Sequence, residues 1–280
     1  MATSQLLRRA LGCAVALLLA LALAAPTAVR TSYAATATTS TTQPGPINAA
    51  NTYGWGPMAW AYDWENGEGL RPWGHWADRT GKVYIEWAMI LLDCNTDQFK
   101  EPCYGSVRST LHRTGERYGR WEMRLRAPVW YDGGRDYRVK AELVPAAADK
   151  YACGAHNIAL ASFLAGGNHV NVYARNAHNQ WTFTKQRMVL DRTSWHTYAV
   201  EVTRHRISWF IDAHVVSTVR NDRAISGLRL TPRLSLQGVS GAAMDRVRIG
   251  VDWVRHFTLA RPNTKSVDAT APVATAYHGC

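Results

Sequence analysis

The sequence predicts an all-β fold, a two-sheet antiparallel β-sandwich of the jelly-roll type. Two observations predict it. Short runs of alternating apolar and polar residues are rich in β-branched and aromatic side chains, and turn-forming residues separate these runs at short intervals. No segment carries an apolar stripe of 3.6-residue period and helical length. Many short strands with frequent turns are typical of sandwiches and jelly rolls.

The clearest strand signals come from four segments. Successive strand residues point to opposite faces, so Arg120–Arg126 places its three apolar residues, among them Trp121, on one face. The other segments are short and rich in β-branched or aromatic residues: Tyr198–Thr203, Arg206–Asp212 and Arg248–Leu259. All four are expected to be strands.

Residues 1–34 are expected to be a signal peptide, which makes the protein secreted. Two arginines precede an apolar run over 14–24. That run has the length of a signal-peptide core and is too short to span a bilayer comfortably. Cleavage sites of the small-x-small type end at residue 24 and at residue 34, and the sequence leaves both open.

The rest of the chain divides into three expected segments. Residues 35–52 are rich in Thr, Ala and Pro without an apolar period, which is typical of a flexible linker. Residues 53–261 are expected to form the single jelly-roll domain, and residues 262–280 a flexible tail. No later stretch approaches the roughly 18 consecutive apolar residues of a transmembrane helix, so we expect no membrane partner after signal removal.

Composition and charge exclude some classes of protein. The chain has 280 residues, 47% of them hydrophobic, which excludes a mainly disordered protein, and twelve Trp, which suit a sugar-stacking cleft as well as a core. Its net charge is +11; without residues 1–34, 29 basic residues remain against 21 acidic ones, a net charge of +8. The basic residues are spread along the chain, so a nucleic-acid partner is not expected, although the charge could attract an anionic polymer. The mature protein is expected to be a monomer.

The cysteines predict a disulfide. Export permits disulfides, and four cysteines after the signal peptide allow three pairings. Cys94 and Cys103 flank a polar stretch typical of a loop between strands, and we predict that they pair, which leaves Cys153 and Cys280. A zinc site is disfavoured, because the sequence has no Cys-x-x-Cys and no His pair at ligand spacing.

Three ordered stretches carry a resemblance to a known family. They are Gly105–Ser109 followed by Tyr118–Pro128, then Trp195–Val216, and then Val251–Phe257. Together they resemble glycoside hydrolase family sixteen, the laminarinase and lichenase-like β-jelly rolls of the secreted bacterial type, from about Trp55 to Arg261. The resemblance implies a concanavalin-like jelly roll whose concave face grips a β-glucan or related polysaccharide.

The resemblance also implies a retaining mechanism with three acidic residues on one strand, as Glu-x-Asp-x-x-Glu. A bulge returns the last residue to the face of the first two, and the acting carboxyls lie about 5–5.5 Å apart. Aligning the family's glycine with Gly154 puts Ala155 at the nucleophile, Asn157 at the central Asp and Leu160 at the acid/base. No Asp or Glu occurs between residues 149 and 191. The sequence therefore predicts that the catalytic motif is lost.

Three functions stay open from the sequence. The first is a catalytically degenerate protein, a pseudoenzyme, that binds a β-glycan in the old cleft. The second is an active endo-acting β-glycan hydrolase with relocated catalytic groups, for which Glu142 is the best substitute. The third is a structural secreted protein without a ligand. Lys140 and Glu142 alternate with apolar residues, so they either line a wet cleft or face solvent.

Further residues are candidates for substrate binding. Sugar rings pack on aromatic side chains, and polar side chains bind their hydroxyl groups. Trp130 and Tyr131 lie in a glycine-containing turn, and Trp181 follows a polar loop. Lys140 lies on the charged strand face, and Arg175 stands near a substrate-contacting His of the family, where it could meet an acidic sugar. For each of these residues a surface-loop position is the alternative.

No cofactor is expected to be required, but the resemblance implies a structural calcium ion on the convex side. Carbonyl groups near Ala61–Gly69 and the carboxylate of Asp252 match the family's ligands in type, and hard oxygen ligands suit calcium. The alternative is that Asp252 pairs with an arginine such as Arg255.

Overall fold

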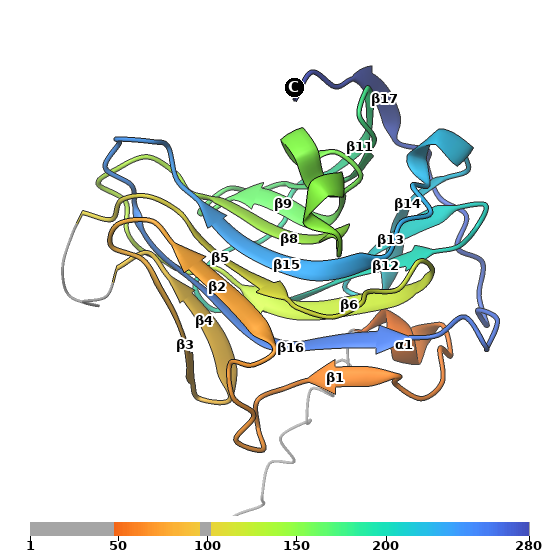
Figure 1. The fold of residues 1–280 in the computed structure, drawn as a ribbon, viewed down its shortest axis with the longest axis horizontal. Coiled ribbons are helices and arrows are strands. Elements are labelled where there is room, and N and C mark those ends of the chain that lie inside the picture. Colours follow the sequence, from red (N-terminus) through yellow and green to blue (C-terminus); the bar gives the residue numbers. More distant parts are fainter. Residues whose placement is uncertain (1–47, 96–101, 280) are drawn as a thin grey trace, which may run out of the picture. The chain divides into compact units, whose positions relative to one another are not determined.

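The described residues form two antiparallel sheets packed face to face (Figure 1). The structure is a computed structural model, and it describes residues 48–95 and 102–279. The described residues all belong to one compact unit. The predicted two-sheet antiparallel sandwich is confirmed. Within the described ranges, no helix has the length and apolar character needed to cross a membrane.

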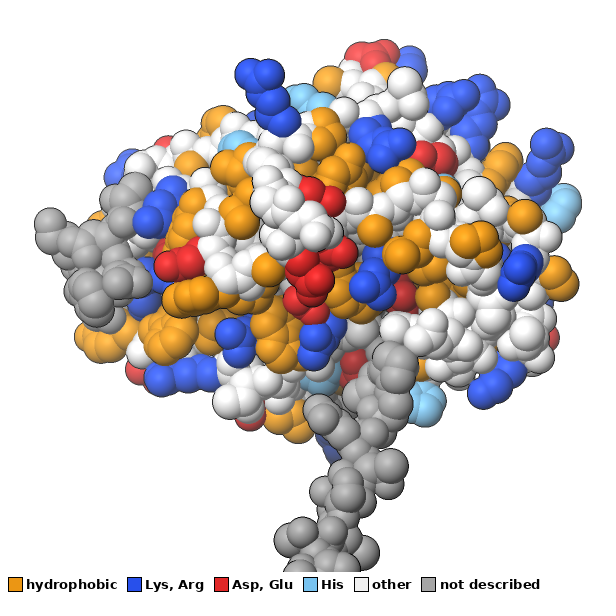
Figure 2. Space-filling model, turned by 90° about the horizontal axis from the view of Figure 1, so that it is seen from below, with side chains coloured by type: hydrophobic (Ala, Val, Ile, Leu, Met, Phe, Trp, Pro, Cys, Tyr) orange, Lys and Arg blue, Asp and Glu red, His pale blue; other side chains and the backbone are white. Residues whose placement is uncertain are grey.

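The first sheet is called the convex sheet here. Its strands, in spatial order, are β14 (His214–Val219), β13 (Ile207–Ile211), β12 (His196–Val202), β6 (Gly119–Arg126), β16 (Arg246–Phe257), β4 (Met89–Asp93) and β3 (Lys82–Glu86), with β1 (Trp60–Tyr62) and β7 (Val129–Tyr131) added on β16. The four strand segments predicted from alternation are β6, β12, β13 and β16, all in this sheet. Figure 2 shows the molecule from the side of β1 and β16: Lys and Arg side chains are spread over this face among hydrophobic ones, and acidic side chains gather near its centre.

The second sheet is called the concave sheet, because its outer face curves around the region above β8 and β15 (Figure 1). Its strands, in spatial order, are β17 (Val273–Ala276), β11 (Asn179–Lys185), β10 (Val170–Arg175), β9 (Ile158–Leu164), β8 (Arg138–Pro145), β15 (Leu230–Gln237), β5 (Val107–Leu111) and β2 (Trp73–Ala77). The helical elements are short: α1 (Ala49–Thr52) and the 3₁₀ segments η1 (Ala148–Gly154) and η2 (Asp222–Ala224).

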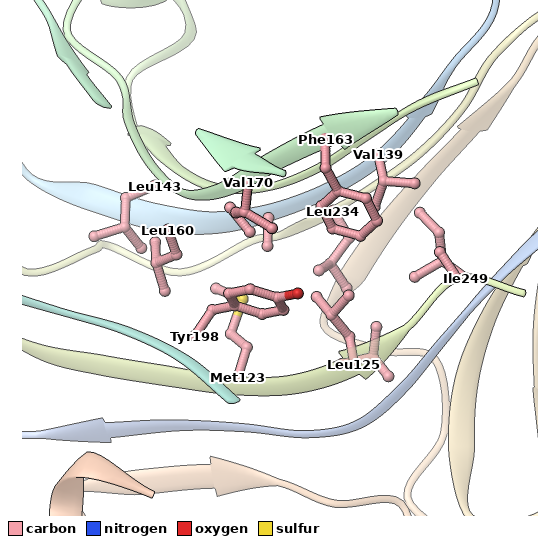
Figure 3. Close-up of a cluster of buried hydrophobic side chains, with 14 of the residues drawn as sticks. Met123, Leu125, Val139, Leu143, Leu160, Phe163, Val170, Tyr198, Leu234 and Ile249 are labelled. Atoms are coloured by element: carbon pink, nitrogen blue, oxygen red, sulfur yellow. The ribbon is translucent and has the colours of Figure 1, made fainter. Parts of the chain in front are cut away.

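The core fills the space between the two sheets (Figure 3). One inward-facing row comes from the convex sheet and includes Met123, Leu125 and Tyr198. The facing row comes from the concave sheet and includes Leu160 and Phe163. The alternation seen in the sequence thus buries one face of each strand, and the outer face of the concave sheet carries polar and charged side chains.

The fold begins before the predicted boundary at residue 53. Residues 48–52 were expected in the flexible linker, but α1 packs in a second buried cluster with Trp55 and Phe210. The buried Glu122 accepts a hydrogen bond from the backbone N–H of Ala49. Burial raises the pKa of Glu122 to about 7, and that backbone N–H acts in the opposite direction. The packing of α1 could not be predicted from the linker-like composition, because this packing depends on backbone donors and small apolar residues.

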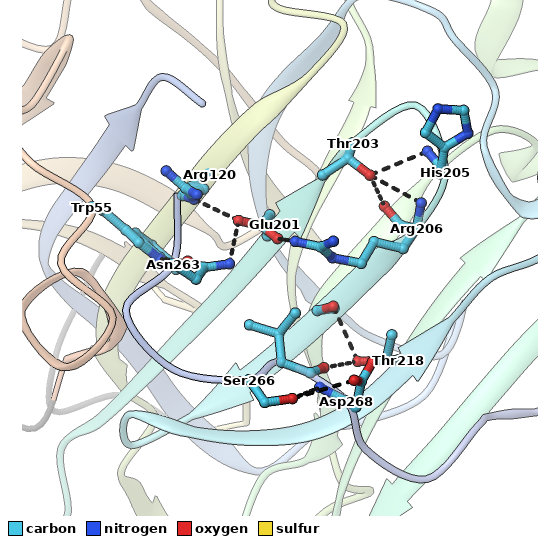
Figure 4. A network of polar contacts seen from close by, with 12 residues as sticks. Trp55, Arg120, Glu201, Thr203, His205, Arg206, Thr218, Asn263, Ser266 and Asp268 are labelled. Atoms are coloured by element: carbon cyan, nitrogen blue, oxygen red, sulfur yellow. Dashed lines mark hydrogen bonds and ion pairs between the residues drawn. The ribbon is translucent and has the colours of Figure 1, made fainter. Parts of the chain in front are cut away.

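The fold also continues past residue 261, into the predicted flexible tail 262–280 (Figure 4). Asn263 accepts a hydrogen bond from the indole N–H of Trp55 and donates one to Glu201. Val267 is buried, and β17 adds an edge strand beside β11. The boundaries 53–261 are therefore too narrow: side chains of the convex sheet bind this segment, although its own sequence has no apolar period.

The predicted disulfide is confirmed. Cys94 and Cys103 are bonded, with Cα atoms 5.5 Å apart, and both are fully buried. The predicted signal peptide, most of the linker, Cys280 and the side chain of Cys153 lie outside the described residues.

Candidate functional site

The strand that corresponds to the catalytic strand of the resembling family is β9. Its ladder with β8 pairs Lys140 with Ser162 and Glu142 with Ala159, and the register shifts between these pairs. The shift leaves Leu160 without a Cα partner, as in a β-bulge. Leu160, Ala161 and Phe163 belong to the core cluster, whereas Ala159 and Ser162 do not.

This geometry corrects the predicted positions of the motif. Leu160 was expected at the acid/base, but it lies in the core between the sheets (Figure 3). Ala155 was expected at the nucleophile on the strand, but it lies in the turn before β9. The spacing Glu-x-Asp-x-x-Glu with a bulge, on the face away from the core, is met by Asn157, Ala159 and Ser162. The sequence alignment was two residues early because the bulge cannot be seen in the alternation.

Glu142 lies at the centre of this face and is fully buried. Its Oε2 accepts a hydrogen bond of 2.6 Å from Nδ2 of Asn157, and its Oε1 accepts one of 3.3 Å from the hydroxyl of Tyr151. Tyr151 belongs to η1, the green coiled segment that stands over the concave sheet in Figure 1. The carboxylate is therefore enclosed between the sheet and η1. The charged residues predicted on this strand, Lys140 and Glu142, do face away from the core. At Glu142, however, Tyr151 covers the carboxylate.

Cationic side chains surround this carboxylate. Burial lowers the pKa of Lys140, and the charge of Glu142 opposes that shift. No ion pair joins the two side chains in the described part of the chain. The guanidinium of Arg175 lies 4.2 Å from the ring centroid of Tyr173 and 4.5 Å from that of Tyr277, near the C-terminal segment. Lys140 and Arg175, both predicted to bind substrate, thus share this face.

A groove of about 880 Å³ lies beside η1 on the same sheet. Its lining could not be predicted from the sequence. Basic and aromatic side chains of β2, β5, β15 and the segments that flank them contribute to it: His75, Trp76, Arg108, His112, Arg113 and Arg233. The signal that could have found part of it is the alternation of Arg108 and Thr110 with inward-facing residues. The strands that form the groove are far apart in sequence, so residue spacing alone could not predict the groove.

The aromatic residues predicted to bind substrate lie in different parts of the structure. Trp130 and Tyr131 are half exposed on β7, which pairs with β16 of the convex sheet. Trp130 lines two cavities of about 410 and 420 Å³, and Tyr131 lines the second; neither residue lines the groove. Trp181 is 4% exposed and belongs to the core, so its predicted role in substrate binding is wrong. Its neighbours in β11, Gln180 and Thr182, take the alternate positions outside the core cluster.

The predicted calcium ligand has another partner. Oδ2 of Asp252 lies 2.7 Å from Nη1 of Arg124, so this aspartate pairs with an arginine, although not with Arg255. Calcium needs several hard oxygen ligands. Among the described residues, no group of three or more His, Cys, Asp or Glu could hold a metal ion. The arginine partner, which the sequence left open as the alternative, is therefore observed, and a calcium ion held by carbonyl groups near Ala61–Gly69 stays a prediction.

Comparisons with known proteins agree with this fold. Residues 163–252 match the model of glycosyl hydrolases family 16, so the resemblance seen in the motifs is confirmed. The match begins directly after Ser162 and does not include the three motif positions. No curated protein sequence matches the chain.

Solved structures extend the similarity over most of the described residues. The laminarinase from Rhodothermus marinus is 18% identical, with a TM-score of 0.56 over 72% of this chain and 96% of that one. The laminarinase catalytic domain from Thermotoga maritima is 13% identical, with a TM-score of 0.53 over 73% of this chain and 99% of that one. At these identities the likeness shows the fold: a laminarinase-like jelly roll of the glycoside hydrolase type.

Proposed function

We propose that this protein is a secreted, catalytically degenerate member of family 16 that binds a β-glycan at its concave sheet. One observation carries the proposal. The three positions with the geometry of the catalytic motif hold Asn157, Ala159 and Ser162, none of which can act as nucleophile or as acid/base in a double displacement. The fold that positions a polysaccharide is kept, and the groups that would cleave it are replaced.

Binding does not need the lost carboxylates. The concave sheet still offers a groove with aromatic and hydrogen-bonding side chains, including Trp76, which is 45% exposed. Its volume falls within the roughly 300–1,000 Å³ of ligand sites in proteins. Solved laminarinases and a non-specific endo-β-1,3(4)-glucanase share the fold, which makes β-1,3- and mixed-linkage glucans the first ligands to test.

Export is the cellular part of the proposal. The predicted signal peptide directs the chain out of the cell, and the buried disulfide between Cys94 and Cys103 is compatible with an oxidising compartment. We propose that the mature protein acts as a soluble monomer. N-terminal sequencing of the protein from culture medium tests the secretion and decides between cleavage after residue 24 and after residue 34.

The alternative is an active hydrolase that uses Glu142. One observation favours it, because Glu142 is paired in the ladder with Ala159, at the centre of the motif positions. Against it, retention needs two carboxyl groups about 5–5.5 Å apart. Glu142 supplies one, and that one is hydrogen-bonded beneath Tyr151.

Affinity electrophoresis on laminarin, lichenan, xyloglucan and agarose tests the binding. We expect retardation by at least one of these glycans, weakened by Trp76→Ala on the concave sheet and unchanged by Trp87→Ala, which removes an exposed tryptophan outside the groove. Absence of retardation by these four glycans and by an acidic glycan, β-1,4-glucuronan, would contradict the proposed function. Release of new reducing ends that Glu142→Gln abolishes would establish the alternative.

A further inference from the structure

The groove beside η1 has a one-sided charge. Its lining contains three arginines and two histidines but no Asp or Glu. The buried Glu142 pairs with Arg233 across the ladder of β8 and β15, but Tyr151 covers it, so its carboxylate is not part of the groove wall. An accessible groove with this lining favours a ligand with negative charge.

Two arginines of the groove lie on neighbouring strands. In the ladder of β15 and β5, Arg233 pairs with Thr110 and Ser235 pairs with Arg108, so the two arginines are diagonal neighbours. Diagonal neighbours in such a ladder are separated by roughly 7–8 Å and lie within reach of long side chains. The two arginines therefore contribute their positive charge to the same part of the groove lining.

Both guanidinium groups are held in place by neutral neighbours. Arg108 lies 4.6 Å from the ring centroid of Trp76. Arg233 donates a 3.1 Å hydrogen bond from Nε to Oγ1 of Thr110 and lies 4.4 Å from the ring centroid of Tyr151. Cation–π and hydroxyl contacts orient a guanidinium without neutralising it.

The three buried arginines among the described residues have carboxylate partners. Arg120 pairs with Glu201, and both Arg246 and Arg248 pair with Asp93. In the described ranges, Arg108 and Arg233 make no such ion pair. The two guanidinium groups are therefore oriented and at least partly exposed without a direct ion pair, and the carboxylate that faces Arg233 across the ladder, that of Glu142, is covered by Tyr151.

We propose that the groove between η1 and β2 binds an acidic glycan, with Arg108 and Arg233 binding the carboxylate or sulfate groups of successive sugars. This proposal rests on the proposed function and specifies its ligand. The planar guanidinium binds such anions by donating two parallel hydrogen bonds to their oxygens. Trp76 and Tyr151 supply the apolar surface for the sugar rings.

A glycan is favoured over a nucleic acid for two reasons. The groove lies on the same sheet face as the three motif positions, in a fold shared with polysaccharide hydrolases. The face shown in Figure 2 has acidic side chains near its centre, which would disfavour a phosphate backbone that extended from the groove onto that face.

The test compares ligands with one backbone and different charge. Isothermal titration of the mature protein would use β-1,4-glucuronan oligomers, neutral cello-oligomers of equal length, sulfated cello-oligomers and single-stranded oligothymidylate. The groove variant is Arg108→Gln with Arg233→Gln. The matched control is Arg204→Gln with Arg187→Gln, which removes two exposed arginines outside the groove. Circular dichroism verifies that both variants are folded.

We expect the protein to bind the glucuronan or the sulfated oligomer at least about tenfold more tightly than the neutral oligomer, with the preference lost in the groove variant and kept in the control. Binding should weaken as salt increases, because exposed charges are screened. Equal affinity for neutral and acidic oligomers would overturn this inference and leave the proposed function standing, whereas no binding to any glycan would contradict both. Oligothymidylate binding as tight as the best glycan, or equal losses in both variants, would identify a non-specific polyanion surface and also overturn the inference.

Discussion

The side-chain amide of Asn157 donates a 2.6 Å hydrogen bond to the carboxylate of Glu142, and both side chains are fully buried. In the family that the chain resembles, the position of Asn157 holds the nucleophilic carboxylate. A carboxylate there would put two like charges within hydrogen-bond distance in a buried site, which is unfavourable. With asparagine the same contact is a satisfied hydrogen bond. The proposed loss of the nucleophile and the presence of Glu142 are therefore structurally complementary.

This pair should behave as one energetic unit. We expect Glu142→Ala and Asn157→Ala each to lower the free energy of unfolding by about 1–3 kcal/mol, because each leaves a buried polar partner unsatisfied. The double variant should lose less than the sum, with a coupling of about 1 kcal/mol. Urea unfolding of the four proteins measures this cycle. Strict additivity would show that the contact does not contribute to stability.

The corrected position of the motif predicts a contrast within β9. Leu160→Glu places a carboxylate in the core between the sheets and should cost more than about 4 kcal/mol, enough to prevent folding. Ser162→Glu places it on the opposite face, where the ladder pairs residue 162 with Lys140. We expect that variant to remain folded with a smaller loss. Thermal melts and soluble yields measure both, and a folded Leu160→Glu variant would restore the alignment based on Gly154.

The strands and the disulfide could be predicted from the sequence because their signals are local. Alternation in Arg120–Arg126 and the polar stretch between Cys94 and Cys103 depend on neighbouring residues only. The face of Leu160 could not be predicted, since one bulge inverts the alternation beyond it. The burial of Trp181 could not be predicted for the related reason that a preceding polar loop does not determine which face of the next strand is buried.

The remaining features depend on contacts between distant segments. The groove combines Trp76, Arg108 and Arg233 from three strands that are adjacent only in the folded sheet. The C-terminal segment has a linker-like composition, and it is held by Glu201 and by backbone pairing of β17. Composition can indicate that a segment lacks an apolar period, but not that another part of the chain binds it.

The disulfide should contribute to stability mainly by restricting the unfolded chain. Cys94 and Cys103 are nine positions apart, and closing a loop of that length is worth about 2–3 kcal/mol. We expect Cys94→Ala with Cys103→Ala to lower the free energy of unfolding by that amount, and reductant to have no further effect on the variant. Urea titrations with and without dithiothreitol measure this. A variant as stable as the oxidised native protein would contradict it.

His196 should make stability fall as the pH rises. Burial lowers its pKa, but hydrogen bonds to the Asp212 carboxylate and the Val189 carbonyl more than reverse this, so the pKa is raised above 6.5. The folded state therefore holds the proton more tightly than the unfolded state. Its contribution is fully present below pH 6.5 and is lost as the pH rises through the folded value.

The matched variant is His196→Gln, which can keep one hydrogen bond but cannot be protonated. We expect the native protein to lose stability relative to this variant as the pH rises from 6.5 through the folded-state pKa of His196, in urea titrations at each pH. A native-minus-variant difference that stays constant over this range would show that His196 is not preferentially protonated in the folded state.

Reducing-end release during prolonged incubation of the native protein with laminarin and lichenan, at protein concentrations that saturate binding, tests the central claim most directly. The account predicts no oligosaccharide beyond the rate of a heat-inactivated control, because Asn157, Ala159 and Ser162 supply neither nucleophile nor acid/base. Turnover in the range of about 1 s⁻¹ or faster, as in ordinary enzymes, would contradict it.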